Sequence, residues 1–234
     1  MKFAGFVKTS LIDFPGKVAA TVFTQGCNFR CGFCHNPDLI PYETEQPETL
    51  IDDVVVLEYL EKRKGLLDGV VITGGEPLIR PEIEEFISKV KSLGYLVKLD
   101  TNGSNPALLA KLIEAGQVDY VAMDIKGAPA DYIRICGFED SKKIGESIAI
   151  IMNSGLDYEF RTTVLPYYHK LESFHALGIS IKGAKRYTVQ GFRPRITLDK
   201  SLESEKSFSP SDLQAIEQIM ADYVVEVVVH ENLA

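Results

Sequence analysis

The chain has 234 residues, 45% of them hydrophobic, which is enough to bury a full core, so we expect one domain over residues 1–234. A formal net charge of −8 excludes proteins that bind nucleic acid through a broadly basic surface. No apolar run approaches the ~20 residues that cross a bilayer, and residues 1–6 lack the apolar stretch of a secretory signal, so we expect a cytoplasmic protein.

The apolar residues predict strands that alternate with helices along the chain. Residues 5–15 are mixed and predict no regular element, and residues 197–209 predict a polar loop. Strands are predicted at residues 18–24, 69–73, 95–100, 120–124, 158–164, 186–189 and 224–229. Helices are predicted at residues 49–64, 81–93, 105–115, 141–154, 171–177 and 210–223, with a short one near residue 131. The alternation predicts an α/β fold of parallel βαβ units, a partial (β/α)6 TIM-type barrel that is open on one side.

Three cysteines, Cys27, Cys31 and Cys34, follow the first predicted strand with the spacing C-x3-C-x2-C. Thiolates are the usual ligands of iron–sulfur clusters, and three of them leave one iron of a four-iron cubane open for a small molecule. His35 could be a fourth ligand, but adjacent residues rarely reach two corners of one site. A zinc site would need a second pair of ligands that the sequence lacks, and reduced structural thiols are the remaining interpretation. The other cysteine, Cys136, is predicted to be a buried thiol.

Polar and glycine residues collect where the other predicted strands end. In a parallel barrel these ends share one rim with the cysteine loop, and sites are built on that rim. The residues are Gly74-Gly75-Glu76, Asp100-Thr101-Asn102, Asp124 with Lys126, Arg161 with Thr163, and Gln190 with Arg193.

Several of these groups also have a purely structural interpretation. Gly74-Gly75 can be a tight turn, and Glu76 can be a carboxylate at a helix N-terminus. Asn102-Gly103 can be turn chemistry. Asp124 and Lys126 face the same side of a strand, so they can form an ion pair.

Three further residues carry expectations about burial. Arg161 interrupts an otherwise apolar strand, and because a buried unpaired charge is costly we expect it to have an anionic partner. His169 and His175 are predicted at the surface, in a loop and a short helix.

The cysteine spacing, with Phe33 before the last cysteine and Gly74-Gly75-Glu76 one strand later, resembles the radical S-adenosylmethionine (SAM) enzymes, and the likeness extends over nearly the whole chain. Residues 100–103 and 124–126 are similar to those of activating enzymes of pyruvate formate-lyase. Residues 8–17 and 34–37 are most similar to proteins named anaerobic ribonucleoside-triphosphate reductase activating protein. The resemblance implies an oxidoreductase that reductively cleaves SAM at a [4Fe–4S] cluster and generates a glycyl radical on a partner enzyme, with anaerobic ribonucleotide reductase as the expected partner.

The same resemblance implies roles for individual residues. Cys27, Cys31 and Cys34 would bind the cluster, and SAM would chelate the open iron through its amino and carboxylate groups. Lys126 would neutralise the SAM carboxylate, and Arg161 would contact the same end or the ribose. The other implied contacts to SAM are Phe33, Cys34 and His35 along the adenine; Gly74, Gly75 and Glu76 at the amino end; Asp100 and Asp124 near the amino group; and Asn102 and Ile125 at an end that the resemblance does not specify.

The resemblance also carries finer expectations. A monovalent cation could lie near Asp100 and Asp124, next to SAM. The histidine that the formate-lyase activators place near SAM has no counterpart, so contact from Gln190 or Arg193 is a weaker expectation. We expect one cluster, a flavodoxin- or ferredoxin-like electron donor, and no side chain acting as acid or base.

Two other functions stay open at this point. The radical chemistry could act on a small molecule or a peptide, as in a deazaguanine-forming synthase. A zinc-binding regulatory module would use the same cysteines without any radical chemistry.

Overall fold

One curved sheet organises the part of the chain that the computed structural model describes, residues 1–44 and 46–231. Within that part the sheet has nine strands in the order β3-β1-β2-β4-β5-β6-β7-β8-β9. The strands are β1 (Lys2–Ser10), β2 (Ala19–Thr24), β3 (Ile51–Asp52), β4 (Gly69–Gly74), β5 (Leu96–Thr101), β6 (Tyr120–Asp124), β7 (Asp157–Val164), β8 (Arg186–Gly191) and β9 (Glu226–His230).

The strands from β2 through β9, leaving out β3, run parallel to one another, so their carboxyl ends share one edge. This arrangement confirms the predicted α/β partial barrel. It is one strand wider than six units, because the last predicted strand, β9, also joins the sheet in parallel with β8.

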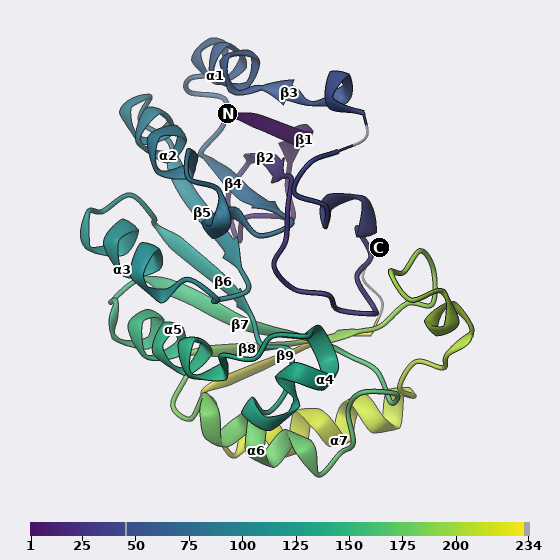
Figure 1. The fold of residues 1–234 in the computed structure, drawn as a ribbon. Helices are drawn as coiled ribbons and strands as arrows, with labels where there is room; N and C mark the ends of the chain where they lie inside the picture. Colours follow the sequence, from purple (N-terminus) through teal and green to yellow (C-terminus); the bar gives the residue numbers. More distant parts are fainter. Residues whose placement is uncertain (45, 232–234) are drawn as a thin grey trace.

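The helices lie on the convex face of the sheet, and the long loop after β2 lies on the concave side (Figure 1). Each helix buries one apolar face; in α2 that face is Ile83, Phe86, Ile87 and Val90, at the spacing of one helical stripe. None of the described helices is both long and apolar enough to span a membrane. The helices are α1 (Asp53–Lys62), α2 (Ile83–Ser92), α3 (Pro106–Glu114), α4 (Tyr132–Cys136), α5 (Ser141–Asn153), α6 (Ser173–Ser180) and α7 (Pro210–Ala221).

Local signals place the ends of several helices where the sequence predicts them. The side chain of Asn105 accepts a hydrogen bond from the Leu108 N–H at the start of α3. Ser209 and Asp212 form a capping box at the start of α7, with Pro210 in its first turn. These contacts satisfy N–H groups that the first turn of a helix leaves without partners.

The sequence missed β1 and misjudged the start of α1. Strand β1 pairs antiparallel with β2. Its buried and exposed residues do not alternate strictly, so the sequence lacks the pattern that marks a strand, and the pairing register is interrupted near Gly5. Helix α1 starts at Asp53 rather than residue 49, because a 3-10 turn (Pro47–Thr49) and β3 come first. The predicted loop 197–209 contains a 3-10 turn, Lys200–Ser204.

Strand β7 shows how the sheet aims its side chains. Tyr158, Phe160, Thr162 and Val164 are buried, and the residues between them are partly exposed. Since successive side chains of a strand point to opposite faces, Arg161 and Thr163 share the face away from the helices. This alternation brings polar side chains to the concave side of the sheet, where the cysteine loop lies.

Candidate active site

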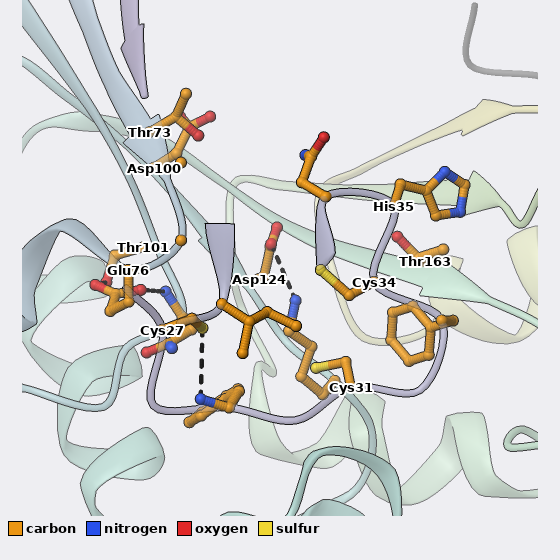
Figure 2. Close-up of a pocket in the computed structure, with 18 of the residues that line it drawn as sticks. Cys27, Cys31, Cys34, His35, Thr73, Glu76, Asp100, Thr101, Asp124 and Thr163 are labelled. Atoms are coloured by element: carbon orange, nitrogen blue, oxygen red, sulfur yellow. Dashed lines mark hydrogen bonds and ion pairs between the residues drawn. The ribbon is translucent and has the colours of Figure 1, made fainter. Parts of the chain in front are cut away.

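A cavity of about 220 Å³ opens at the carboxyl ends of β4–β7, beneath the loop that follows β2. Figure 2 shows the side chains of Cys31 and Cys34 pointing into this space, with Asp124 facing them. The cavity is lined by Cys27, Phe29, Cys31, Phe33, Cys34, His35, Asn36, Ile40, Thr73, Gly74, Gly75, Glu76, Asp100, Thr101, Asn102, Asp124, Lys126, Arg161 and Thr163.

The cysteine loop has no regular secondary structure, and backbone hydrogen bonds hold it in place. The N–H of Gly26 donates to the Leu39 carbonyl at 2.8 Å, and the N–H of Cys27 donates to the Ile40 carbonyl at 3.0 Å. Farther along the loop, the N–H of Arg30 donates to the carbonyl of Cys136 in α4 at 2.8 Å. These bonds close the loop over the cavity and bring its three cysteines to one wall.

The three thiols suit an iron–sulfur cluster by their chemistry. Burial raises the pKa of Cys27 to about 12 and also raises that of Cys34, while the ammonium of Lys126 acts in the opposite direction on both. The pKa of Cys31 is raised too, first by a contact with the Cys136 thiol and then by burial. Thiols of this kind stay protonated until a metal displaces the proton, and soft thiolates favour iron–sulfur clusters and zinc. No three of His, Cys, Asp and Glu in the described part of the chain gather closely enough to hold a single metal ion.

The glycine turn after β4 lies directly against the cysteine loop. A Cβ on Gly75 would be 2.0 Å from the Gly26 carbonyl oxygen, and one on Gly74 would be 2.2 Å from the Thr24 nitrogen. Gly74 also has a φ of 125°, which favours glycine. The turn is therefore a place of close backbone approach. A larger residue at position 75 would push the cysteine loop away, and one at position 74 would clash with the end of β2.

Glu76 is buried at 1% exposure, and both its carboxylate oxygens accept hydrogen bonds from the protein. Oε1 accepts from the Leu78 N–H at 3.1 Å and from Thr101 Oγ1 at 2.7 Å. Oε2 accepts from the Asn102 N–H at 2.6 Å. Burial raises the pKa of Glu76 to about 7, although these three bonds lower it. The predicted role of Glu76 at a helix N-terminus is confirmed, and its side chain also ties the end of β4 to the end of β5.

A cluster of opposite charges occupies the ends of β5, β6 and β7. Arg161 Nε lies 3.0 Å from Asp124 Oδ1, and its Nη1 lies 3.4 Å from Asp100 Oδ2. Lys126 Nζ lies 3.1 Å from Asp124 Oδ2, a contact drawn as the dashed line from Asp124 in Figure 2. The buried Lys98 pairs with Asp100. The anionic partner predicted for Arg161 and the ion pair predicted for Asp124 and Lys126 are both confirmed.

Burial and pairing act against each other in this cluster. Burial alone would raise the pKa of Asp124, but Lys126 and Arg161 outweigh it and hold the pKa well below its usual range. Burial alone would lower the pKa of Lys126, but the carboxylate of Asp124 outweighs it and raises the pKa. Asp124, Lys126 and Arg161 are therefore charged near neutral pH. Lys98, Arg161 and Lys126 pair with the carboxylates of Asp100 and Asp124, and Glu159 acts on Arg161 as a further anion. Of the three cations, Lys126 and Arg161 line the cavity, where they can meet an anionic ligand.

The structure brings most of the predicted site residues to this cavity. Ile125 and Gln190 do not line it: Ile125 is buried behind it, and Gln190 Oε1 accepts from Thr163 Oγ1 at 3.5 Å one strand farther along the sheet. Arg193 does not line the cavity either. Burial lowers the pKa of His35, and the positive charge of Arg193 lowers it further. The lining residues to which no contact with SAM or the cluster was assigned are Phe29, Asn36, Ile40, Thr73, Thr101 and Thr163.

Strand-end position predicted Thr101 and Thr163 at the rim, although without an assigned contact, and Asn36 and Thr73 adjoin predicted residues. Thr101 lies between two predicted residues, and Thr163 is two positions from Arg161 on the same face of β7. Ile40 carries no such signal, because the folding of the loop alone brings it to the cavity.

The prediction for one histidine is wrong. His169 is buried at 3% exposure, because the segment after β7 turns back beneath the end of β6 and its ring bonds to the Lys126 carbonyl at 2.8 Å. His175 is exposed on α6, as predicted. Cys136 is a buried thiol, as predicted, and its Sγ donates to the Tyr132 carbonyl at 3.1 Å.

Comparisons with known proteins agree with this geometry. Residues 21–177, about two thirds of the chain, match the family described as the radical SAM superfamily. A protein of Methanocaldococcus jannaschii, provisionally named a glycyl-radical enzyme activating enzyme, is 29% identical over 232 residues, which is 97% of this chain and 94% of that protein. The pyruvate formate-lyase-activating enzyme of Staphylococcus epidermidis is 32% identical over 135 residues, which is 54% of this chain and 53% of that enzyme.

Among solved structures, SuiB of Streptococcus suis has a TM-score of 0.65 at 15% sequence identity. The similarity covers 90% of this chain and 48% of SuiB. At that identity the likeness supports the fold of this chain and nothing beyond it.

Proposed function

Because this chain belongs to the radical SAM superfamily, we propose that it is the activating enzyme of a glycyl-radical enzyme. When bound, the [4Fe–4S] cluster would supply one electron to SAM, which splits into methionine and a 5′-deoxyadenosyl radical that takes a hydrogen atom from a glycine Cα of the partner. The relative that covers 97% of the chain carries the name of such an enzyme, and this supports the proposed target.

The proposal rests on the set of chemical groups that line one cavity. Three thiols line one wall, a close glycine turn lies beside them, and the charge cluster, with Lys126 and Arg161 lining the cavity, lies opposite. The thiols would hold the cluster. The remaining space then offers an apolar wall, backbone polar groups and cations, which match the adenine, the amino group and the carboxylate of SAM.

We assign the cations to the carboxylate end of SAM. Lys126 lines the same cavity as the three cysteines and is paired with Asp124, so its ammonium lies in the space proposed for the cluster and SAM. Arg161 lines the same cavity and is held by Asp100 and Asp124. A group fixed in this way needs little reorganisation to bind a carboxylate.

We assign the backbone of Gly74, Gly75 and Glu76 to the amino end of SAM. The side chain of Glu76 already accepts three hydrogen bonds, so its task is to hold Thr101 and Asn102 at the rim. The aromatic ring of Phe33 and the backbone through Cys34 and His35 would lie along the adenine. Asp100 and Asp124 remain proposed for the amino end, Asn102 as a further contact to SAM, and Gln190 for the ribose or adenine.

Three finer points belong to the proposal. A monovalent cation near Asp100 and Asp124 would have to share them with Arg161, which lies between these carboxylates; a requirement for potassium or sodium ions would support it. Anaerobic ribonucleotide reductase is the proposed partner, and a flavodoxin- or ferredoxin-like protein the proposed electron donor.

The test is anaerobic reconstitution with iron and sulfide, followed by reduction in the presence of SAM. We expect formation of 5′-deoxyadenosine and methionine, and a glycyl radical in the electron paramagnetic resonance spectrum when anaerobic ribonucleoside-triphosphate reductase is added. Cys34→Ala, prepared identically, is the control for chemistry that does not depend on the cluster. A reconstituted protein that holds iron but leaves SAM intact would refute the proposal.

Two outcomes would redirect the proposal. Cleavage of SAM without a glycyl radical on any glycyl-radical enzyme would favour a small molecule or a peptide as the target. A colourless protein that holds one zinc ion would favour the regulatory module.

A further inference from the structure

Lys126 lies two residues beyond the end of β6 at Asp124, so the sheet does not hold its backbone. The last backbone hydrogen bond from this segment to β7 is the one that the Ile125 N–H donates to the Arg161 carbonyl at 2.8 Å. Both backbone polar groups of Lys126 are instead bonded by side chains. Its N–H donates to the Tyr132 hydroxyl at 3.2 Å, and its carbonyl lies 2.8 Å from His169 Nε2.

The bonds of His169 determine which nitrogen carries its proton. The Leu165 N–H donates to His169 Nδ1 at 3.3 Å, so Nδ1 is the acceptor and Nε2 carries the proton that it donates to the Lys126 carbonyl. Burial lowers the pKa of His169, which keeps the ring neutral and this tautomer in place. The ring also packs against Phe174, with centroids 5.9 Å apart.

The surroundings leave this contact little freedom. Tyr132, the other partner of Lys126, is 1% exposed and packs edge-on against Phe29 of the cysteine loop. A Cβ on Gly127, the next residue, would be 2.6 Å from Ile135 of α4. The backbone of Lys126 is therefore clamped from α4 on one side and from the segment after β7 on the other, while its ammonium lines the cavity.

We propose that His169, with Tyr132, is a positioning residue that fixes the backbone of Lys126 so that its ammonium meets the carboxylate of SAM. The inference rests on the proposed function, because it assigns SAM to the cavity. A buried histidine with two neutral hydrogen bonds to backbone groups far apart in the sequence is well suited to hold a binding residue in one geometry.

Three substitutions of His169 separate positioning of Lys126 from local support of the loop. His169→Gln can place an amide N–H near the site of Nε2 and so keep the donor to Lys126. His169→Asn can place an amide oxygen near the site of Nδ1 and so keep only the acceptor for Leu165. His169→Ala removes both. The matched control is His175→Ala, which changes an exposed histidine of α6.

The measurements are the dissociation constant of SAM for the cluster-loaded protein, from calorimetry, and the KM and kcat of SAM cleavage. Loss of one hydrogen bond that orients a charged group corresponds to a roughly tenfold loss of affinity. We expect His169→Ala and His169→Asn to raise the dissociation constant and KM about tenfold with kcat within about twofold, and His169→Gln to restore both to within about threefold. His175→Ala should behave as the unsubstituted protein.

Hydrogen exchange gives a readout that does not involve SAM. In the protein without SAM, the amides of Lys126 and Gly127 should exchange faster in His169→Ala and His169→Asn than in His169→Gln. If His169→Ala fails to fold, Tyr132→Phe serves in its place, because it keeps the ring and removes the acceptor for the Lys126 N–H.

Two results would overturn the inference: unchanged SAM affinity in His169→Ala or Tyr132→Phe, or equal restoration by His169→Asn and His169→Gln. Both presuppose an unsubstituted protein that binds and cleaves SAM. If that protein does neither, the proposed function fails, and the exchange rates at Lys126 still report whether His169 holds its backbone.

Discussion

The two walls of the cavity are built in different ways. The cysteine wall is a loop held by a few backbone hydrogen bonds, and its three thiols stay protonated until a metal binds. The opposite wall consists of strand ends, where the sheet register sets the positions of Arg161 and Asp124, which are direct partners across β6 and β7. The strand-end wall is therefore formed by folding alone, whereas the cysteine wall is complete only when its thiols bind the cofactor.

The largest expected effect is on the cysteine wall. Substituting Cys27, Cys31 or Cys34 with Ala should abolish cluster binding and SAM cleavage, because an iron loses its ligand. Unfolding of the metal-free protein should change little, since no protein partner of these thiols is essential to the sheet. Iron content, visible absorbance and denaturant unfolding measure these effects. Cys136→Ala is the control and should retain the cluster; its loss in that variant would show that Cys136 is a ligand.

Arg161→Ala should have the opposite effects: it should lower the stability of the metal-free protein and leave cluster binding intact. It leaves Asp124 with one cation instead of two and removes a buried partner of Asp100, so the metal-free protein should lose roughly 3 kcal/mol of unfolding free energy. Cluster binding should survive, since the cysteine loop does not use Arg161. Urea unfolding of the metal-free protein checks the first point and iron content the second. Arg195→Ala, a change at an exposed arginine, should leave stability unchanged. Equal stability of the two variants would mean that the strand-end wall is not held by its ion pairs.

Glu76 makes the stability of the strand-end wall depend on pH. Its pKa is about 7 in the folded protein, against 4.5 for the ordinary group, so the folded state binds the extra proton between these values. The stabilising contribution of this proton is complete below pH 4.5 and is lost as the pH rises to 7, a change on the order of 3 kcal/mol. Glu76→Gln does not titrate, so the difference in unfolding free energy between the two proteins should vary with pH in that window. A difference independent of pH would show that Glu76 has an ordinary pKa.

The smallest effect tests the contact between the two walls. Gly75→Ala places a methyl group within 2.0 Å of the Gly26 carbonyl oxygen, and forcing the loop away should destabilise the protein by roughly 2 kcal/mol. Gly145→Ala is the matched control: it lies in α5 with nothing within 4 Å of the new methyl group and should stabilise the helix by about 0.5–1 kcal/mol. Thermal unfolding compares them. If Gly75→Ala is as stable as the control, the walls do not touch as closely as the structure shows.

Several features could be predicted from the sequence because they depend on neighbouring residues. The alternation of strands and helices follows from apolar periodicity, and the helix starts at Asn105 and Pro210 follow from local caps. The C-x3-C-x2-C spacing places three thiols in one loop whatever the rest of the chain does. Strand-end position then predicted that Asp100, Asp124, Lys126 and Arg161 would meet at one rim, since parallel strands end at one edge.

Only the tertiary structure decided how these groups are used. Strand β1 exists because β2 offers a partner across the sheet, although its own residues do not alternate. His169 is buried because a segment from after β7 packs under the end of β6, and no pattern around residue 169 reports that contact. The side chain of Glu76 is committed to Thr101 and Asn102, which lie 25 and 26 residues away in sequence. Periodicity and caps act between neighbours along the chain, whereas burial and the pairing of charges depend on residues that only folding brings together.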